Sequence, residues 1–353
     1  MGNSLKVGIL GCGAVAKKWY LPGLSNKNAF YKIDAVADLN IKRAKNSAKR
    51  FNIPNYYKSL KGLMKHKPKL DLIVVLTRHQ DHYIHIKSAL KNGFHVYSEK
   101  PFAENPKKGI ELIKLARSKK LYFGAAPQSF LATRFQKLKD LIEKGRIGKI
   151  TLARISGSNM GPAYRKGVDY DPRWFYNEGG SLDSLGIYNL TATIFLFGMP
   201  KRVSGFSGIV MPKRVVMYGP MKGEYFKVTA PDNEVAILDF GEGIFALFDG
   251  SYSVYNPPKF DFEIHGTNGS LFSGGFGGKE SIILIKNGQE HFVGPEDDCH
   301  FKWTLAWGVE ETIKAIIQKK KNKLDAKIAL DTIIIIDAIR KSSLTNKQIL
   351  IKT

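Results

Sequence analysis

The pattern of apolar and polar positions changes at about residue 125, and the two parts predict different folds. Over residues 5–124, short apolar runs alternate with stretches in which apolar residues recur every three or four positions. The apolar runs predict strands at residues 6–10, 32–37, 70–76, 95–98 and 121–125. Helices fit between them, as at 41–51 and at 82–92, where Gly93 ends the helix. This alternation predicts right-handed crossovers and a parallel, doubly wound sheet.

After residue 125, consecutive strands replace the alternation. A helix at 133–144 closes at Gly145, and strands are expected at 149–156, 234–240, 243–251 and 260–265. A tight glycine turn at 240–243 indicates antiparallel pairing. Residues 273–278 predict a glycine-rich loop, and helices are expected at 303–319 and 326–342. The chain therefore predicts two domains, residues 1–124 and 125–353.

The first strand runs directly into a glycine motif, Gly11-Cys12-Gly13-Ala14-Val15-Ala16, at the start of a helix. In such a G-x-G-x-x-A sequence, Gly11 permits a tight turn, Gly13 lets the backbone approach a pyrophosphate, and Ala16 keeps the helix close to the sheet. The phosphates would bind at the helix N-terminus, where Ala14 and Val15 form the first turn. The motif predicts a dinucleotide site; the alternative is an ordinary sharp turn.

An acidic residue strengthens this prediction, because Asp38 closes the second strand about 25 residues beyond Gly13. A carboxylate there can bind the ribose hydroxyls and would repel a 2′-phosphate, so Asp38 favours NAD. Lys42 and Arg43 follow closely and would accept that phosphate if the loop folded back. NADP therefore stays open as the cofactor.

Charge and cysteine content narrow the class of protein. The formal net charge is +24, but the lysines are scattered and no nucleic-acid-binding motif accompanies them, so we expect a lysine-rich surface and no specific nucleic-acid partner. Cys12 and Cys299 are the two cysteines and lie far apart, which favours a reducing compartment. The N-terminus lacks the pattern of a secretory signal, and the longest aliphatic run, residues 333–336, is too short to span a bilayer. We expect a soluble, cytoplasmic protein with no membrane partner.

At Glu99-Lys100-Pro101, within residues 97–103, the sequence resembles the glucose-fructose oxidoreductase, inositol dehydrogenase and rhizopine-catabolism protein (Gfo/Idh/MocA) family. Further matching stretches are the glycine motif, residues 71–77 with His82, 145–148, 171–188, 263–270 and the C-terminal helices. The resemblance implies an α/β protein with an N-terminal Rossmann dinucleotide-binding domain. It also implies a C-terminal α+β domain, with an open, mostly antiparallel sheet, for substrate binding and oligomerisation.

The resemblance further implies an NAD(P)-dependent dehydrogenase or reductase of CH–OH groups, with Lys100 as a catalytic residue. Pro101 favours an extended backbone at Lys100, which would direct the ammonium into the crevice at the strand ends. There it would hydrogen-bond the reacting oxygen. Outside this context, a Glu-Lys-Pro sequence is usually a capped helix start.

Residues 174–190 resemble the family's glycine-led helix, which carries Asp-x-Gly-x-His or Asp-x-Gly-x-Tyr, and Tyr188 takes the final position. Tyr188 would then exchange the hydroxyl proton, since a nearby Lys100 cation would lower its pKa; half-buried packing is the alternative. The usual aspartate position holds Ser184, and Asp183 lies one place earlier, about 100° around a regular helix. Either a local irregularity brings Asp183 into the site, or Ser184 replaces the carboxylate.

Other candidate residues have equally plausible structural roles. Thr77, His79 and His82 resemble the family's loop at the nicotinamide, and simple loop roles are the alternative. Glu99, Gln128 and Trp174 are further candidate cofactor contacts, although core or surface placement is as ordinary for the last two. His79, His82 and His85 are spaced three apart, but no carboxylate or fourth ligand accompanies them, so we expect no metal.

The substrate class expected from the resemblance is a sugar, cyclitol or sugar derivative, and the basic surface mildly favours an anionic one. An open sheet face in the second domain predicts a homodimer or homotetramer. Two other functions stay open: a sensor on the same fold that binds the dinucleotide without turnover, and an enzyme that retains its cofactor while it oxidises one sugar and reduces another.

Overall fold

The structure is a computed structural model that describes residues 4–25, 30–275, 281–294 and 305–352. Cys299 and the predicted helix start at 303–304 therefore lie outside the described residues, as does part of the predicted loop at 273–278. The described residues form two compact units, one drawn from residues 1–128 and 302–333 and the other from 129–301 and 334–353. We expected one division near residue 125, whereas the chain changes unit three times.

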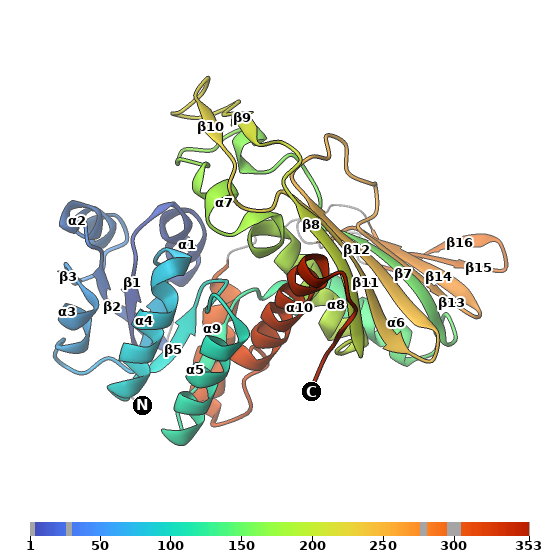
Figure 1. Cartoon of the computed structure of the whole chain (residues 1–353). Helices are drawn as coiled ribbons and strands as arrows, with labels where there is room; N and C mark the ends of the chain where they lie inside the picture. Colours follow the sequence, from blue (N-terminus) through green and yellow to red (C-terminus); the bar gives the residue numbers. More distant parts are fainter. Residues whose placement is uncertain (1–3, 26–29, 276–280, 295–304, 353) are drawn as a thin grey trace. The chain divides into compact units, whose positions relative to one another are not determined.

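The first unit contains a six-stranded parallel sheet in the order β3-β2-β1-β4-β5-β6 (Figure 1). Its strands are β1 (Leu5–Leu10), β2 (Tyr31–Ala37), β3 (Asn55–Tyr57), β4 (Leu72–Val75), β5 (His95–Ser98) and β6 (Phe123–Ala125). The strand order changes direction between β1 and β4, and ligands of such sheets bind beside the carboxyl ends at that point. The predicted doubly wound parallel sheet is confirmed.

Helices connect these strands in the first unit. They are α1 (Leu21–Leu24), α2 (Ile41–Arg50), α3 (Leu60–Met64), α4 (His79–Lys91) and α5 (Pro106–Ser118). Three of them have side-chain caps: Asn40 caps α2, Ser59 caps α3 and Asn105 caps α5.

A helix from near the C-terminus, α9 (Ala306–Gln318), also belongs to this unit and packs against β5 and β6. Small residues allow the approach: a Cβ on Gly308 would lie 2.3 Å from the Tyr97 hydroxyl oxygen, and one on Gly124 would lie 2.3 Å from Thr312 Oγ1. The apolar period of residues 303–319 predicted the helix but carried no information about the sheet on which it packs.

The second unit contains a nine-stranded sheet in the order β16-β15-β14-β13-β7-β12-β11-β8-β17. The strands are β7 (Ile150–Ser156), β8 (Arg202–Gly208), β11 (Asn233–Gly241), β12 (Ile244–Ser251), β13 (Phe262–Gly266), β14 (Gly269–Ser273), β15 (Ile283–Lys286), β16 (Gln289–Phe292) and β17 (Ile349–Leu350). Every neighbouring pair is antiparallel except β7 and β12, which are parallel. The mostly antiparallel second sheet is thus confirmed.

Helices cover one face of this sheet: α6 (Thr133–Glu143), α8 (Ile187–Phe197) and the later part of α10 (Ala326–Thr345) (Figure 1). The inward positions of β11 and β12 are buried, for example Leu238 and Phe248. Alternate positions on the other face are apolar and exposed, as at Ile237 and Leu247. The sheet therefore has one packed face and one open apolar face.

A small module adjoins the sheet and consists of α7 (Trp174–Asn177) and the hairpin β9 (Lys213–Val215) with β10 (Tyr225–Lys227). Its core contains Tyr176 and Tyr252, whose ring centroids are 4.9 Å apart. Arg214 and Asp232 form an ion pair at 2.7 Å, and both side chains are fully buried. The Arg214 guanidinium also lies over the Tyr176 ring, so it fixes the strand pair to α7.

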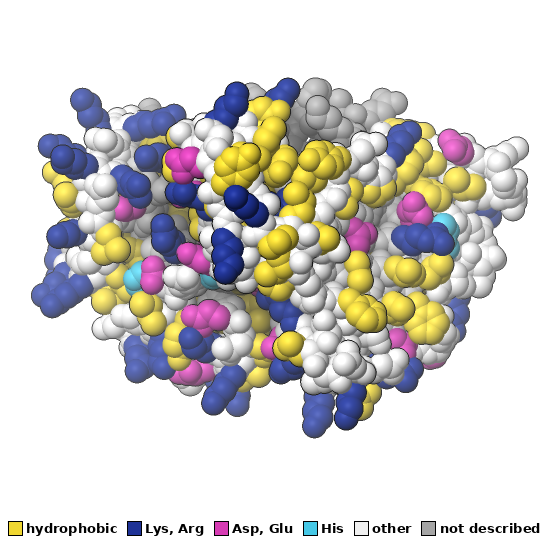
Figure 2. Space-filling model, turned by 45° about the horizontal axis from the view of Figure 1, so that its top comes forward, with side chains coloured by type: hydrophobic (Ala, Val, Ile, Leu, Met, Phe, Trp, Pro, Cys, Tyr) yellow, Lys and Arg dark blue, Asp and Glu magenta, His cyan; other side chains and the backbone are white. Residues whose placement is uncertain are grey.

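Within the residues that the structure describes, no helix is long and apolar enough to cross a membrane. The same residues contain no group of three or more histidine, cysteine, aspartate or glutamate side chains arranged to hold a metal ion. Lysine and arginine side chains are scattered among acidic and apolar ones over the face in Figure 2.

Candidate active site

The loop after β1 has a geometry typical of phosphate-binding loops. Gly11 has a φ of +102°, and a Cβ there would lie 2.5 Å from the carbonyl oxygen of Leu76. A Cβ on Gly13, in contrast, would meet no atom within 4 Å, so space is open above this residue. The helix begins at Ala14, and its first bond runs from the Lys17 N–H to the Gly13 carbonyl at 3.1 Å. The backbone N–H groups of the first turn, at Ala14 and Val15, fit the pyrophosphate of a dinucleotide.

Asp38 follows β2 and lies against this loop. One carboxylate oxygen accepts a hydrogen bond from the Cys12 N–H at 2.8 Å, and the other accepts one from the Asn40 N–H at 2.8 Å. Asp38 is half-buried, whereas Lys42 and Arg43, in the first turn of α2, are exposed. A carboxylate for the ribose and cations for a 2′-phosphate are therefore both present after β2.

Glu99 and Lys100 follow β5 directly, and so lie at the carboxyl edge of the sheet beside the neighbouring β4. Glu99 is buried and accepts hydrogen bonds from the Tyr20 hydroxyl at 2.6 Å and from the Lys100 N–H at 3.0 Å. Lys100 is half-buried, and the Lys100–Pro101 peptide bond is cis. The motif thus lies at the edge where parallel sheets bind their ligands.

His82 connects two loops at this edge. Its ring is 1% exposed, with Nδ1 2.8 Å from the Pro101 carbonyl oxygen and Nε2 3.0 Å from the Thr77 carbonyl oxygen. Burial lowers its pKa to about 4, so the neutral ring donates to one of these carbonyls. His82 therefore fixes the loops that hold Thr77 and Pro101 and is itself enclosed by protein.

The other candidate cofactor contacts in the first unit are Thr77, His79 and Gln128, and they differ in burial and in hydrogen-bond partners. The Thr77 hydroxyl lies 3.2 Å from His85 Nδ1, and His79 is half-buried at the start of α4. Gln128 is buried after β6, and its Nε2 donates to the Leu305 carbonyl at 3.4 Å. Its Oε1 accepts no hydrogen bond from the described residues.

In the second unit, the glycine-led segment forms an irregular helix. Trp174 begins α7 and stacks on Phe175, with ring centroids 3.7 Å apart. A π-helical turn, η4 (Leu182–Gly186), then leads into α8, and the Ile187 N–H donates to the Leu182 carbonyl. Tyr188, the second residue of α8, is half-buried, and its carbonyl accepts from the Ser129 hydroxyl at 2.9 Å.

The π-turn lies between Asp183 and Tyr188 and bears on the shifted position of the aspartate. A π-turn bonds residue i to i+5 and so inserts one residue into a helix. Asp183 and Tyr188 are five residues apart across η4, where a regular helix would align residues four apart. The structure therefore contains the local irregularity required for Asp183 to take the usual aspartate position.

The Asp183 carboxylate belongs to a charged network. It pairs with the Arg340 guanidinium of α10 at 2.6 Å, and Arg340 also pairs at 2.9 Å with Glu234, whose side chain is fully buried. Burial alone would lower the pKa of Arg340, but the carboxylates of Asp183 and Glu234 outweigh it and raise that pKa. Ser184 is buried instead and interacts with the Tyr252 hydroxyl, in the core of the α7 module.

Sequence reasoning missed Tyr20, Arg340 and Glu234. Tyr20 lies seven residues after Gly13, and Arg340 follows an aliphatic stretch of α10. Their partners are 79 and more than 100 residues away in sequence. An unexpected arginine beside apolar helix positions was the one local signal.

Comparison with known families supports this architecture. Residues 5–126 match the model of the oxidoreductase family with an NAD-binding Rossmann fold, and residues 135–272 match the GFO/IDH/MocA C-terminal domain. The fold and site define an NAD(P)-dependent oxidoreductase that acts on a CH–OH group. The chain belongs to the Gfo/Idh/MocA family.

Individual relatives agree with this assignment. The chain is 26% identical over 311 residues to the NADP⁺-dependent scyllo-inositol 2-dehydrogenase IolW of Bacillus subtilis, covering 87% of this chain and 76% of that one. It is 28% identical to mouse trans-1,2-dihydrobenzene-1,2-diol dehydrogenase, covering 58% of this chain and 61% of that enzyme. The fold matches the aldose-aldose oxidoreductase of Caulobacter crescentus with a TM-score of 0.81 at 18% identity, over 99% of this chain and all of that one.

Proposed function

We propose that the protein transfers hydride between NAD(P) and a secondary alcohol or ketone on a six-membered ring, as in a cyclitol or sugar. The observation that carries the proposal is the position of Lys100 at the carboxyl edge of the sheet that also bears the open Gly13 loop. The names of the inositol dehydrogenase and the dihydrobenzenediol dehydrogenase denote six-membered rings with neighbouring secondary alcohols, which supports this substrate class.

The proposal gives each catalytic candidate a chemical role. The bound nicotinamide supplies the hydride acceptor or donor. The Lys100 ammonium hydrogen-bonds the reacting oxygen and stabilises negative charge on it. Tyr188 takes the hydroxyl proton during oxidation and returns it during reduction. Asp183, five residues before Tyr188 across the π-turn, supplies a carboxylate to the site.

Turnover assays with NAD and NADP test this proposal on a panel of inositols, aldoses, glycosides and sugar acids. We expect Lys100→Ala to retain dinucleotide affinity while kcat falls by about 100-fold or more, the range for loss of a positioned charge or acid/base group. Tyr188→Phe should act alike and remove one limb of the pH profile. Lys91→Ala and Tyr225→Phe, at exposed positions outside the site, are the matched controls.

Each result has a defined reading. Full activity of both site variants on a substrate of the wild-type protein contradicts the catalytic assignment. Dinucleotide binding without turnover on any member of the panel would instead indicate the sensor function, in which the fold binds a cofactor without chemistry.

We also propose that the protein is a cytoplasmic homodimer or homotetramer assembled through the open sheet face. Two cysteines in 353 residues agree with a reducing compartment. The open face exposes the apolar side chains of Phe206, Val235, Ile237, Phe245 and Leu247, and contiguous exposed apolar side chains favour a protein interface. The net charge of +24 further favours an anionic sugar derivative as substrate.

A further inference from the structure

The helix that follows the glycine loop is not a regular α-helix. It begins at Ala14 and changes into a π-helical turn, η1 (Ala16–Tyr20), before α1. Tyr20 ends this turn, and its side chain is 0% exposed. The extra residue of a π-turn changes the direction of the side chains that follow, and such turns are frequent at functional sites.

The Tyr20 hydroxyl donates to Glu99 Oε1 at 2.6 Å and lies 3.3 Å from the Tyr97 hydroxyl. Burial, and then the Glu99 carboxylate, raise the pKa of Tyr20 well above its ordinary value. Tyr20 therefore keeps its proton and acts as a permanent donor. A hydrogen bond to a buried carboxylate is among the stronger kinds, because the acceptor is charged and shielded from water.

The other oxygen of the same carboxylate accepts the backbone N–H of Lys100 at 3.0 Å. One buried group thus joins the helix of the glycine loop to the peptide unit that carries the lysine. On the C-terminal side of Lys100, the Pro101 carbonyl oxygen lies within hydrogen-bond distance of the His82 ring. The backbone of Lys100 is therefore held between Glu99 and His82, and Tyr20 fixes Glu99.

We propose that Tyr20 is a positioning residue that orients Lys100 through Glu99, so that the helix that binds the dinucleotide phosphates also sets the direction of the reacting lysine. This inference rests on the proposed role of Lys100. Without the hydroxyl, the Glu99 carboxylate turns to another donor and releases the Lys100 N–H, which displaces the ammonium from the reacting oxygen. Displacements of about 1 Å can lower rates by about 100-fold.

The test compares Tyr20→Phe with Tyr31→Phe. Both changes remove one tyrosine-to-glutamate hydrogen bond in the first unit, since the buried Tyr31 donates to Glu310 Oε1 at 3.1 Å. We expect Tyr20→Phe to lower kcat by about tenfold or more, while the calorimetric Kd for the dinucleotide stays within about threefold of wild type. Tyr31→Phe should leave kcat within about twofold, with a comparable loss of unfolding free energy in denaturant titrations.

A second pair keeps the test decisive if Tyr20→Phe does not fold. Glu99→Gln retains an oxygen for Tyr20 but presents an N–H₂ group to the Lys100 N–H, and Glu310→Gln is its control. We expect Glu99→Gln to lower kcat by about tenfold or more and Glu310→Gln to leave it within about twofold of wild type, and an unchanged kcat in Glu99→Gln would overturn the inference. Where Tyr20→Phe folds, a cycle with Glu99→Gln should give strongly non-additive losses in kcat, because both act through one carboxylate.

Equal kcat values in Tyr20→Phe and Tyr31→Phe, with Lys100→Ala still crippled, would overturn this inference and leave the proposed function intact. Additive losses in the cycle would also overturn it. Full turnover in Lys100→Ala would overturn both.

Discussion

Gly11 and Gly13 are two residues apart, yet different constraints act on them. Gly11 has a positive φ, and a Cβ there would lie 2.5 Å from the Leu76 carbonyl oxygen, so a side chain strains the fold itself. Gly13 has no positive φ and open space around it, so a side chain there is compatible with the fold and blocks whatever binds above it. A substitution at Gly11 should therefore affect folding, and a substitution at Gly13 should affect ligand binding.

Gly13→Val should abolish dinucleotide binding while thermal unfolding stays close to wild type, because the branched side chain fills space that the pyrophosphate requires. Gly208→Val is the matched control, since Gly208 on β8 also has open space and no positive φ. Calorimetry and a thermal melt give the two measurements. Undiminished binding in Gly13→Val would place the phosphates elsewhere.

We expect Asp38 to govern cofactor choice and to favour NAD, because its carboxylate repels a 2′-phosphate. Asp38→Ala should weaken NAD binding and improve the affinity for NADP relative to NAD. Calorimetry with both dinucleotides checks this. The same measurement on Lys42→Ala and Arg43→Ala shows whether either cation binds the 2′-phosphate of NADP. Wild-type binding of NADP at least tenfold tighter than NAD, about 1.4 kcal/mol, would contradict the role of Asp38.

The sequence predicted where residues next to a strand or a short motif lie. It did not predict contacts between residues far apart in the chain. Gly11, Gly13, Asp38 and Lys100 follow strands directly, so a strand pattern and a short motif placed them at one edge of the sheet. The Tyr20 hydroxyl depends on a contact across 79 residues, and a tyrosine in an amphipathic helix is indistinguishable from ordinary packing until the fold is known.

At the scale of elements, the predicted strand and helix boundaries mostly fall within a few residues of the observed ones, because burial sets the hydrophobic period. The sequence did not predict the strands β8 and β14–β17 or the hairpin β9–β10. Short or exposed strands leave little alternation of apolar and polar residues. The π-turn η4 was foreseen only as one alternative, from the shifted aspartate. An inserted residue alters helix period too little to read from apolar positions alone.

Asp183→Asn and Ser184→Ala distinguish the two alternatives for this turn. If η4 places Asp183 in register with Tyr188, Asp183→Asn should lower kcat by about 100-fold or more and Ser184→Ala by less than about threefold. Steady-state kinetics checks the pair, with Arg340→Lys as the variant that keeps a cation beside Asp183. The reverse ranking would assign the polar role to Ser184.

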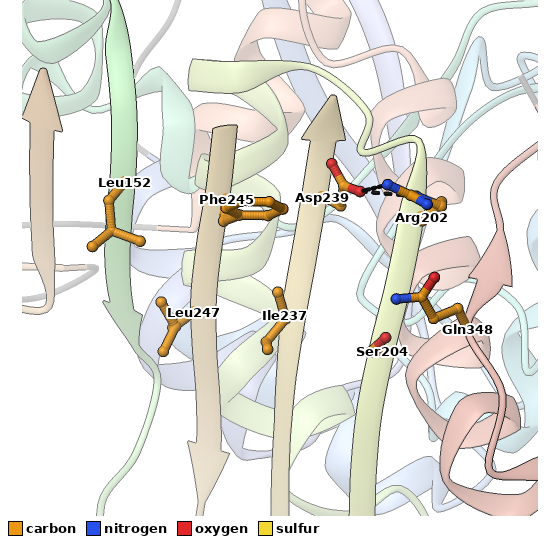
Figure 3. Close-up of a pocket in the computed structure, with 8 residues that line it drawn as sticks. All are labelled: Leu152, Arg202, Ser204, Ile237, Asp239, Phe245, Leu247 and Gln348. Atoms are coloured by element: carbon orange, nitrogen blue, oxygen red, sulfur yellow. Dashed lines mark hydrogen bonds and ion pairs between the residues drawn. The ribbon is translucent and has the colours of Figure 1, made fainter. Parts of the chain in front are cut away.

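At the scale of the whole molecule, we expect the open face of the nine-stranded sheet to govern the oligomeric state. Leu152, Ile237, Phe245 and Leu247 form an apolar surface at its centre, bordered by the Arg202–Asp239 ion pair (Figure 3). An apolar centre with a polar rim is the anatomy of a protein interface. The scattered positive charge in Figure 2, in contrast, carries no such pattern.

Light scattering should therefore give a multiple of 39.5 kDa at micromolar concentration, and Ile237→Asp should shift the protein towards the monomer. Burial of an unpaired carboxylate in the interface is the reason. Ile84→Asp, at another exposed apolar position, is the control and should leave the mass unchanged. A wild-type mass of 39.5 kDa would contradict assembly.

The late position of α9 in the chain also dictates an order of events during synthesis. The ribosome completes all six strands of the first sheet by Ala125, yet the helix that packs on β5 and β6 begins about 180 residues later, at Ala306. Until then Tyr97 and Gly124 lack their packing partners in α9, and we expect this uncovered part of the sheet to favour chaperone binding or misassembly. The first unit therefore begins the chain but is complete only after α9 has been synthesised. A fragment that stops at residue 128 should aggregate and have a low free energy of unfolding.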